Sequence, residues 1–321
     1  MAEINISVII CTFNGVKKLE KTLSHLIDQQ VSPDVSWELI LVDNNSTDHT
    51  VSYSEAFWKQ KQVRNIPLII LAEPKPGKLY ALQRAISTAR GENIVLCDDD
   101  NWLASNYLQK THELLMRMPQ VAAVGGFGIP AAKRIPDWFI DYQFGYAVGP
   151  QAASPGYLPK TGFLWGAGMG FRKSLYLEMY DSIPSLLPEY KEANILSAED
   201  TEFSLRLQLK GYRLYYDPSL VYHHEITPER LTVEYRDRLF KGFVDSHAVL
   251  GLYHAALSTQ VKTNSKPHYW LFLWLKSVFN STFAINKNRR SKYKNTLQFL
   301  FPNTPSNDSW IETVKLFMRK S

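Results

Sequence analysis

The chain has 321 residues, of which 45% are hydrophobic and 21% are charged, a balance typical of folded globular proteins. Its formal net charge is only +5, too small an excess to indicate a nucleic-acid-binding protein, so no nucleic-acid partner is expected. The first residues lack the basic and apolar segments of a signal peptide. No apolar run approaches the roughly 20 residues that span a bilayer, and we expect a cytoplasmic location.

The first hundred residues alternate apolar strands with segments of helical periodicity. Strands are expected at 4–10, 37–42, 66–71 and 94–97, with helices at 16–30, up to about 64, and at 78–90. This alternation is typical of an α/β fold with a parallel sheet covered by helices on both faces. Ligands of such sheets bind beyond the carboxyl ends of the strands. Here those ends are followed by polar or acidic residues, at 12–14, 43–46 and 98–100.

The fourth of these strands leads directly into three consecutive carboxylates, Asp98, Asp99 and Asp100. Three adjacent acids repel one another and resist desolvation unless a cation lies among them. A divalent metal ion is the simplest such cation, and it usually also binds substrate phosphates. The alternative is a solvated acidic turn before a helix that begins near Ala104, because Asp is favoured near helix N-termini.

Other segments narrow the choice of fold and function. The loop at 12–15 is neither a dinucleotide-binding fingerprint nor a P-loop. The glycines at 125, 126 and 128 follow another apolar strand and are expected to form a bend. Residues 129–160 are irregular and aromatic; aromatic faces suit sugar rings, although packing is their commoner use.

A second group of carboxylates opens a helix that is expected to begin after the N-cap Ser197 and to end at Gly211. Glu199 and Asp200 lie in its first turn, where the helix dipole favours acids, so capping alone can explain them. A carboxylate at this position also stays ionised and can act as a base.

Two adjacent histidines, His223 and His224, follow short strands expected at 212–216 and 220–222. Neighbouring residues of a strand point to opposite faces, so at most one of these histidines can face the crevice. A long helix is expected from Pro228 onward, with Thr227 as its N-cap.

Several of these pieces, taken in order, resemble the GT-A-fold glycosyltransferases of family 2, which transfer a sugar from a nucleotide donor to an acceptor hydroxyl with inversion. The pieces are residues 8–14, 41–48, 76–78, 90–100, 168–173 and 199–203, followed by His223 and 228–230. They extend over residues 4–240. The resemblance implies a GT-A (Rossmann-like), mostly parallel sheet flanked by helices, and a metal-dependent enzyme of the hexosyltransferase class.

The resemblance also assigns roles to residues of this chain. Nucleotide binding is implied for Thr12, Phe13, Asn14, Asp43, Asn45, Lys78, Asp98 and Asp99. The D-x-D pair Asp98 and Asp100, with His223 or alternatively His224, is implied to hold Mn²⁺ or Mg²⁺. Asp200 resembles the catalytic base, with Glu199 beside it, and acceptor binding is implied for Trp165, Gly168 and Met169.

One segment departs from the family pattern. Relatives usually have Ala-Arg-Asn after the Gly-Lys pair, whereas this chain has Ala81-Leu82-Gln83-Arg84. Either Arg84 supplies the missing charge or this face of the helix differs. The contacts to the diphosphate are therefore left open, whereas the donor implied by the resemblance is a nucleotide-sugar with UDP as the favoured nucleotide.

The expected organisation is a catalytic domain over 1–240, with a nucleotide-binding half at 1–128 and an acceptor half at 129–240, and a helical C-terminal extension over 241–321. In the extension, the apolar stretch 269–275 precedes a basic cluster at 287–294. These form either an interfacial helix pair on anionic lipid or a helix packed on the catalytic domain. The first reading predicts membrane contact through 269–294, at the inner face of the cell membrane.

The sequence leaves three functions to weigh. The first is a glycosyltransferase acting on a glycan or lipid-linked glycan acceptor in bacterial surface polysaccharide or glycolipid assembly. The second is a sugar nucleotidyltransferase, against which the loop 12–15 lacks the Gly-rich, basic triphosphate-binding sequence. The third is a non-catalytic sugar-binding protein of the same fold, which gives no reason for an intact acidic triplet with Asp200.

Overall fold

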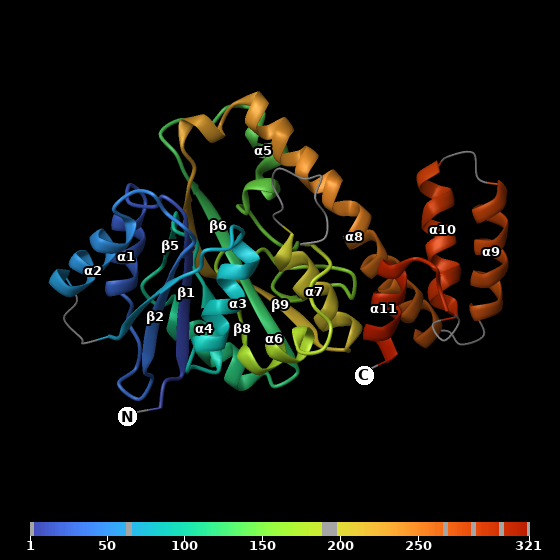
Figure 1. The fold of residues 1–321 in the computed structure, drawn as a ribbon, viewed down its shortest axis with the longest axis horizontal. Coiled ribbons are helices and arrows are strands. Elements are labelled where there is room, and N and C mark those ends of the chain that lie inside the picture. The colour runs from blue at the N-terminus through green and yellow to red at the C-terminus, as the bar shows by residue number, and fades with distance from the viewer. Residues whose placement is uncertain are drawn as a thin grey trace. The chain divides into compact units, whose positions relative to one another are not determined.

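The structure, a computed structural model, describes residues 3–61, 66–187, 198–265, 269–283, 287–301 and 305–319 (Figure 1). Its strands are β1 (Ile6–Thr12), β2 (Trp37–Asp43), β3 (Leu68–Ala72), β4 (Asn93–Leu96), β5 (Asn101–Leu103), β6 (Val121–Ala131), β7 (Gly156–Tyr157), β8 (Gly170–Arg172) and β9 (Arg213–Glu225). Its α-helices are α1 (Leu19–Ile27), α2 (Thr50–Lys61), α3 (Lys78–Thr88), α4 (Tyr107–Arg117), α5 (Phe139–Tyr142), α6 (Lys173–Tyr180), α7 (Glu199–Leu209), α8 (Val233–Ser265), α9 (Tyr269–Phe283), α10 (Lys287–Leu300) and α11 (Ser309–Arg319).

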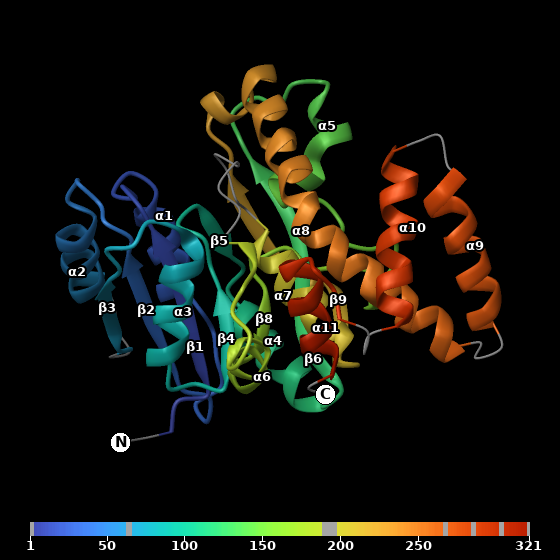
Figure 2. The same cartoon turned by 45° about the vertical axis from the view of Figure 1, so that its right-hand side comes forward.

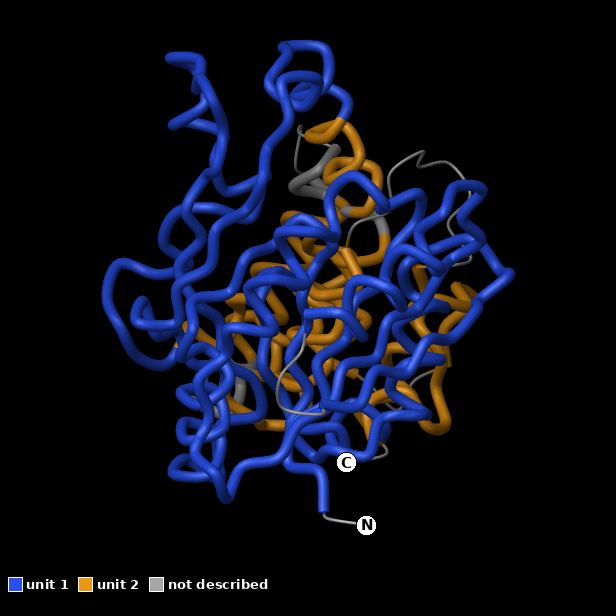
Figure 3. The backbone as a smooth tube through the Cα atoms, turned by 90° about the vertical axis from the view of Figure 1, so that its left-hand side faces the viewer, with its two compact units in different colours: residues 1–157, 164–177, 214–238 blue, residues 158–163, 178–213, 239–321 orange. Residues whose placement is uncertain are grey.

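The chain divides into two compact units (Figure 3). Unit 1 comprises residues 1–157, 164–177 and 214–238, and unit 2 comprises 158–163, 178–213 and 239–321. Helix α7 belongs to unit 2. The expected division into a nucleotide-binding half, an acceptor half and a C-terminal extension stays a prediction.

Unit 1 is built on a sheet with the strand order β3-β2-β1-β4-β8-β6-β9-β5, in which β7 also pairs with β9. The pairs β1–β2, β1–β4 and β2–β3 are parallel, as the alternation of strands and helices predicts. Beyond β4 the pairing changes, since β8 is antiparallel to both β4 and β6, and β5 is antiparallel to β9. The sheet is therefore mixed, and its parallel half carries the carboxyl ends at which a ligand is expected.

Helices cover both faces of the parallel half (Figure 2). Alternate residues of β1, such as Val8, pack into one core with residues of α1, α2 and α4. Residues between them, such as Ile9, are also fully buried and point to the other face. Helix α3 contacts β1 and β2 there, with Ala81 and Leu82 among its buried residues.

The glycines at 125, 126 and 128 do not form the expected bend; they lie within strand β6. A Cβ atom on Gly126 would lie 2.0 Å from the carbonyl oxygen of Leu220, and one on Gly128 would lie 2.5 Å from that of Ala147. Glycine is thus needed for close backbone approach. Two other expectations were also wrong in detail: residues 213–225 form one strand, and α8 begins only at Val233, after a 3₁₀ turn at Pro228–Arg230.

Unit 2 is helical and is organised around the fully buried Arg206 of α7. Its guanidinium lies 3.2 Å from the Glu202 carboxylate, which also accepts a hydrogen bond from Tyr253 of α8 at 2.8 Å. The ring of Phe317 in α11 lies 5.2 Å from the Arg206 guanidinium. Arg206 also donates to the carbonyl oxygens of Met179, Ile183 and Pro184. These contacts fix α7 to α8, α11 and the segment that follows α6.

Candidate nucleotide-binding and catalytic residues

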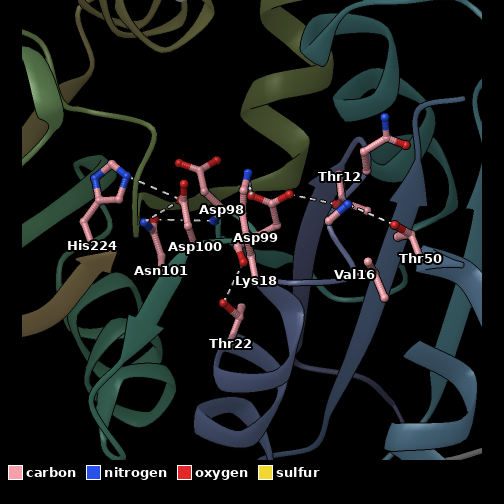
Figure 4. A network of polar contacts seen from close by, with 12 residues as sticks. Thr12, Val16, Lys18, Thr22, Thr50, Asp98, Asp99, Asp100, Asn101 and His224 are labelled. Atoms are coloured by element: carbon pink, nitrogen blue, oxygen red, sulfur yellow. Dashed lines mark hydrogen bonds and ion pairs between the residues drawn. The ribbon is translucent and has the colours of Figure 1, made fainter. Parts of the chain in front are cut away.

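In unit 1, the loops that follow β1, β2 and β4 meet at the carboxyl edge of the sheet (Figure 4). The Thr12 hydroxyl donates to Asp99 Oδ2 at 2.8 Å, and the Asn44 amide donates to the Thr12 carbonyl oxygen at 2.8 Å. The Asn44 side chain accepts from the Gly77 amide at 2.8 Å, just before Lys78. Four segments that are distant in sequence are thus joined by hydrogen bonds.

Two asparagines shape the first two loops. Asn14 and Asn45 have φ angles of 51° and 70°, a left-handed conformation that is uncommon outside glycine and often marks functional loops. The Asn14 amide donates to Ser46 Oγ at 2.9 Å, and its side-chain oxygen accepts from the Thr47 amide at 2.8 Å. Phe13, directly before Asn14, is 58% exposed, so its ring is accessible to a ligand.

Asp99 is the carboxylate that points towards the first loop. It is buried, and Lys18 Nζ lies 3.2 Å from its Oδ1. Burial, together with repulsion from Asp100, raises the pKa of Asp99 despite the hydrogen bonds from Thr12 and Lys18. The charge of Asp100 thus makes ionisation of Asp99 harder, and a cation close to both carboxylates would relieve this repulsion.

Asp100 points the other way, towards His224 and Arg230. Arg230 Nη1 lies 3.0 Å from its Oδ2, and His224 Nε2 lies 3.4 Å from its Oδ1. Burial by itself would raise the pKa of Asp100, but the Arg230 guanidinium and, when its ring is protonated, His224 outweigh it and hold that pKa below its ordinary value. Asp100 therefore stays ionised at neutral pH.

Each carboxylate of the triplet faces a basic side chain, because Lys78 Nζ lies 2.6 Å from Asp98 Oδ1. Lys18, Lys78 and Arg230 thus offset the mutual repulsion of the three carboxylates, which was the reason for expecting a bound cation. Lys78 was an expected ligand of the nucleotide. Lys18 and Arg230 had no expected role, since their pairing with the triplet depends on how helix α1 and the 3₁₀ turn fold back to β4.

The histidine that lies beside the triplet is His224, which was the alternative to His223 as the expected metal ligand. The His223 ring lies 6.5 Å from that of Trp102, while His224 is buried and contacts Asp100. The two point to opposite faces of β9, as the strand geometry requires. His224 Nδ1 donates to the Tyr146 carbonyl oxygen at 2.7 Å, so in the neutral ring Nε2 carries the lone pair, which suits a metal ligand.

The available donor atoms decide whether a divalent ion fits these residues. Within the described ranges, no group of three or more His, Cys, Asp or Glu side chains is arranged to hold a metal ion. The Asp100 carboxylate and His224 Nε2 nevertheless converge at 3.4 Å. Mg²⁺ commonly takes only one or two protein ligands and completes its shell with water and substrate phosphates. The residues therefore fit an ion shared with a diphosphate, and not a closed protein cage.

The candidate base lies in unit 2, in the first turn of α7. Of the three acids in this turn, Glu202 is fully buried in the Arg206 network, so its role is structural. Glu199 and Asp200 are half-buried. Asp200 Oδ1 accepts from the Thr201 amide at 2.6 Å, and Glu199 Oε2 accepts from the Ala198 amide at 3.0 Å. The expected N-cap Ser197 lies outside the described residues.

The residues expected to bind the acceptor differ in accessibility. Met169 is fully buried, so its side chain belongs to the core and cannot contact an acceptor. Gly168 has a φ of 71°, and its carbonyl oxygen accepts from the Tyr107 hydroxyl at 2.7 Å. Trp165 is half-buried, and its amide donates to the Gln151 side chain at 2.8 Å. Asp43, expected at the nucleotide base, is also half-buried.

Comparison with solved structures identifies the fold class. The chain is similar to Staphylococcus aureus TarS 1–349 in complex with UDP, with a TM-score of 0.55 and 16% identity over 98% of this chain and 92% of that one. It is also similar to the mannosyltransferase PcManGT from Pyrobaculum calidifontis in complex with GDP-Man and Mn²⁺, with a TM-score of 0.55 and 20% identity over 94% and 86% of the two chains. The fold is that of the GT-A glycosyltransferases.

Comparison of sequences identifies the family. The profile of Glycosyl transferase family 2 matches residues 7–179, more than half of the chain, and the chain belongs to this family. A Methanococcus voltae dolichyl N-acetyl-α-D-glucosaminyl phosphate 3-β-D-2,3-diacetamido-2,3-dideoxy-β-D-glucuronosyltransferase is 25% identical over 67% of this chain. The poly(ribitol-phosphate) β-glucosyltransferase of Bacillus spizizenii is 23% identical over 72%. The matches span 65% and 34% of these relatives' lengths.

Proposed function

We propose that this protein is an inverting, metal-dependent glycosyltransferase that moves a sugar from a nucleotide-sugar, with UDP as the favoured nucleotide, to an acceptor hydroxyl. The observation that carries the proposal is the junction of the loops after β1, β2 and β4 around three carboxylates, in a chain of glycosyl transferase family 2. The acceptor we propose is a glycan or lipid-linked glycan of a bacterial surface polysaccharide or glycolipid, glycosylated at the cytoplasmic face of the membrane.

The donor is proposed to lie along the carboxyl edge of the sheet. Asp43 would accept hydrogen bonds from the nucleotide base, beside the loop 12–14, and Asp99 would meet the ribose. The diphosphate would then lie near Asp98 and Asp100, where Lys78 and Arg230 are already present. Their positive charges would stabilise the negative charge that grows on the leaving diphosphate.

A Mn²⁺ or Mg²⁺ ion would be held by Asp100 and His224, with Asp98 beside them. When bound, such an ion acts as a Lewis acid on the diphosphate oxygens. His224 is oriented for this role by its hydrogen bond to the Tyr146 carbonyl oxygen. The neighbouring Asn101 is fully buried, and its side chain lies 3.4 Å from Asp100 Oδ1, which restricts the carboxylate's orientation.

The reaction needs one proton acceptor. In the proposal, Asp200 removes the proton from the acceptor hydroxyl as its oxygen bonds to the anomeric carbon, while the bond from that carbon to the diphosphate oxygen breaks. A single displacement inverts the configuration and requires no carboxylate nucleophile, unlike the retaining glycosidases. The Asp200 carboxylate accepts a hydrogen bond from the Thr201 amide at 2.6 Å and lies in the first turn of α7, where the helix dipole stabilises a negative charge.

The test is Asp200→Asn, with Glu199→Gln as the matched neighbour. We expect Asp200→Asn to abolish sugar transfer while the affinity for the donor stays nearly unchanged, because the amide cannot accept the proton. Glu199→Gln should retain measurable transfer. Unimpaired turnover by Asp200→Asn would reject Asp200 as the base, and release of pyrophosphate from a nucleoside triphosphate plus a sugar phosphate would replace the proposal with nucleotidyl transfer.

A further inference from the structure

Helix α9 of unit 2 exposes a continuous apolar face. Its large apolar side chains with the greatest exposure are Leu271 (55%), Phe272 (50%), Leu275 (54%) and Phe279 (63%), and Val278 is 39% exposed. At about 100° per residue these positions cover one arc of about 120° on the helix. Soluble monomers rarely leave such an arc open unless it binds something.

Another face of α9 is buried inside the protein. Leu273, Ser277 and Asn280 are buried on another side of α9, and α9 packs against α10. On α10, Thr296 and Phe299 are buried in turn. The buried side of α9 is therefore distinct from its exposed apolar arc.

The segment of the sequence that contains α9 is basic and contains no acid. Between Asp245 and Asp308 the chain has eight of its 36 lysines and arginines and none of its 31 aspartates and glutamates. The eight are Lys262, Lys266, Lys276, Lys287, Arg289, Arg290, Lys292 and Lys294. The remaining chain is net acidic, so nearly all of the excess positive charge that could attract an anionic surface lies in this segment.

We infer that α9 and α10 bind the surface of an anionic lipid bilayer, with the apolar face of α9 inserted at the level of the headgroups. This deepens the proposed location of the enzyme and rests on that part of the proposed function. The 15 residues of α9 extend about 22 Å, less than the roughly 30 Å of a bilayer core, so the helix lies along the surface. No helix in the described parts of the chain is long and apolar enough to cross a bilayer.

Charge and shape together favour lipid over other partners. A second copy of the chain would bring an equally basic segment to the contact and would be repelled. A nucleic acid would match the charge but would leave the five exposed aliphatic and aromatic side chains of this helix face without an apolar partner. An anionic bilayer satisfies both features, because basic residues attract the headgroups and apolar residues enter the acyl boundary.

The experiment is sedimentation of the full-length protein with vesicles of phosphatidylcholine alone or with about 30% phosphatidylglycerol. We expect binding to the anionic vesicles only, weakened by 0.5 M salt. Lys292→Glu/Lys294→Glu should weaken it at least about tenfold, since each basic residue near the surface contributes about fivefold. Phe272→Ser/Phe279→Ser should weaken it comparably.

Matched controls replace equally exposed residues elsewhere. Lys59→Glu/Lys61→Glu on α2 and Met116→Ser/Val244→Ser, at residues 65% and 70% exposed, should bind vesicles as the wild type does. Equal binding to both kinds of vesicle, or binding that α9 variants leave unchanged, overturns the inference. So does equal binding to a soluble polyanion such as RNA that Phe272→Ser/Phe279→Ser does not weaken.

The proposed chemistry is read out separately, by release of nucleoside diphosphate in the presence of a soluble acceptor. The α9 variants should leave this rate unchanged. If the wild type releases nucleoside diphosphate but does not bind vesicles, only the inference about the membrane is refuted. Normal vesicle binding without release for any donor would refute only the proposed transferase.

Discussion

Arg230→Ala tests whether the guanidinium and a divalent ion occupy the same place beside Asp100. The substitution leaves Asp100, which is 7% exposed, without the cation that lies 3.0 Å away. Removing one partner of a buried ion pair costs about 3–5 kcal/mol. We expect the lower end, because a quarter of the Arg230 side chain is exposed. This corresponds to a melting temperature about 6–12 °C lower.

The same substitution should strengthen metal binding in the absence of nucleotide. An ion at Asp100 and His224 must displace Arg230 Nη1, which lies 3.0 and 3.2 Å from them. A charged hydrogen bond is worth about 1.5–3 kcal/mol, so the variant should bind Mn²⁺ about 10–100-fold more tightly. Electron paramagnetic resonance of free Mn²⁺ measures this directly, and Mn²⁺ should recover part of the lost melting temperature.

The control is Arg90→Ala, which creates a similar lesion at the other end of the sheet. Arg90 Nη2 lies 2.6 Å from the fully buried Glu38 near the start of β2. This variant should lose a comparable amount of stability with no change in Mn²⁺ affinity. If Arg230→Ala binds Mn²⁺ no more tightly than the wild type, Arg230 and the ion do not compete and the assignment of Asp100 as a ligand fails.

Three further changes test neighbouring parts of the account. Gly15→Ala should weaken nucleotide binding in titration calorimetry, since its Cβ would lie 2.1 Å from Thr12 Oγ1 and displace the bond to Asp99; unchanged affinity would contradict this. Gly126→Ala should lower the free energy of unfolding, measured in urea, by about 1–3 kcal/mol. No loss would refute the close approach of the backbones at Gly126 and Leu220. The pKa of Asp100 is lower in the folded than in the unfolded protein, where it is about 3.9, so its ionised form stabilises the fold above that pH and this stability is lost as pH falls. Asp100→Asn should therefore reduce the fall in the free energy of unfolding, measured in urea, between neutral and acidic pH. An unchanged fall would exclude that contribution.

The parallel half of the sheet was predictable because its strands are apolar runs separated by amphipathic helices. The antiparallel half was not. Strand β5 has only three residues and lies between the acidic triplet and helix α4, where no strand was expected. Gly125 and its neighbours suggested a bend, because the sequence does not reveal that another backbone approaches within contact distance.

The site was predictable in its acids and less so in its bases. The triplet and Asp43 are recognisable because strand ends in α/β sheets place polar residues at one edge. Lys18 and Arg230 are surface-like residues in the sequence, and their charge becomes informative only when folding places them against Asp99 and Asp100. The choice between His223 and His224 depends on strand register, because a slip of one residue moves every side chain of the strand to the opposite face.

The most direct test of the central claim is calorimetric titration of the purified protein with UDP, GDP and dTDP in the presence of Mn²⁺. The account predicts one saturable site for at least one nucleotide, with affinity lowered at least about tenfold in both Asp43→Ala and Asp100→Asn through the loss of charge-assisted contacts. If none of the three nucleotides binds, or if both variants bind as well as the wild type, the carboxyl edge of this sheet is not a donor site.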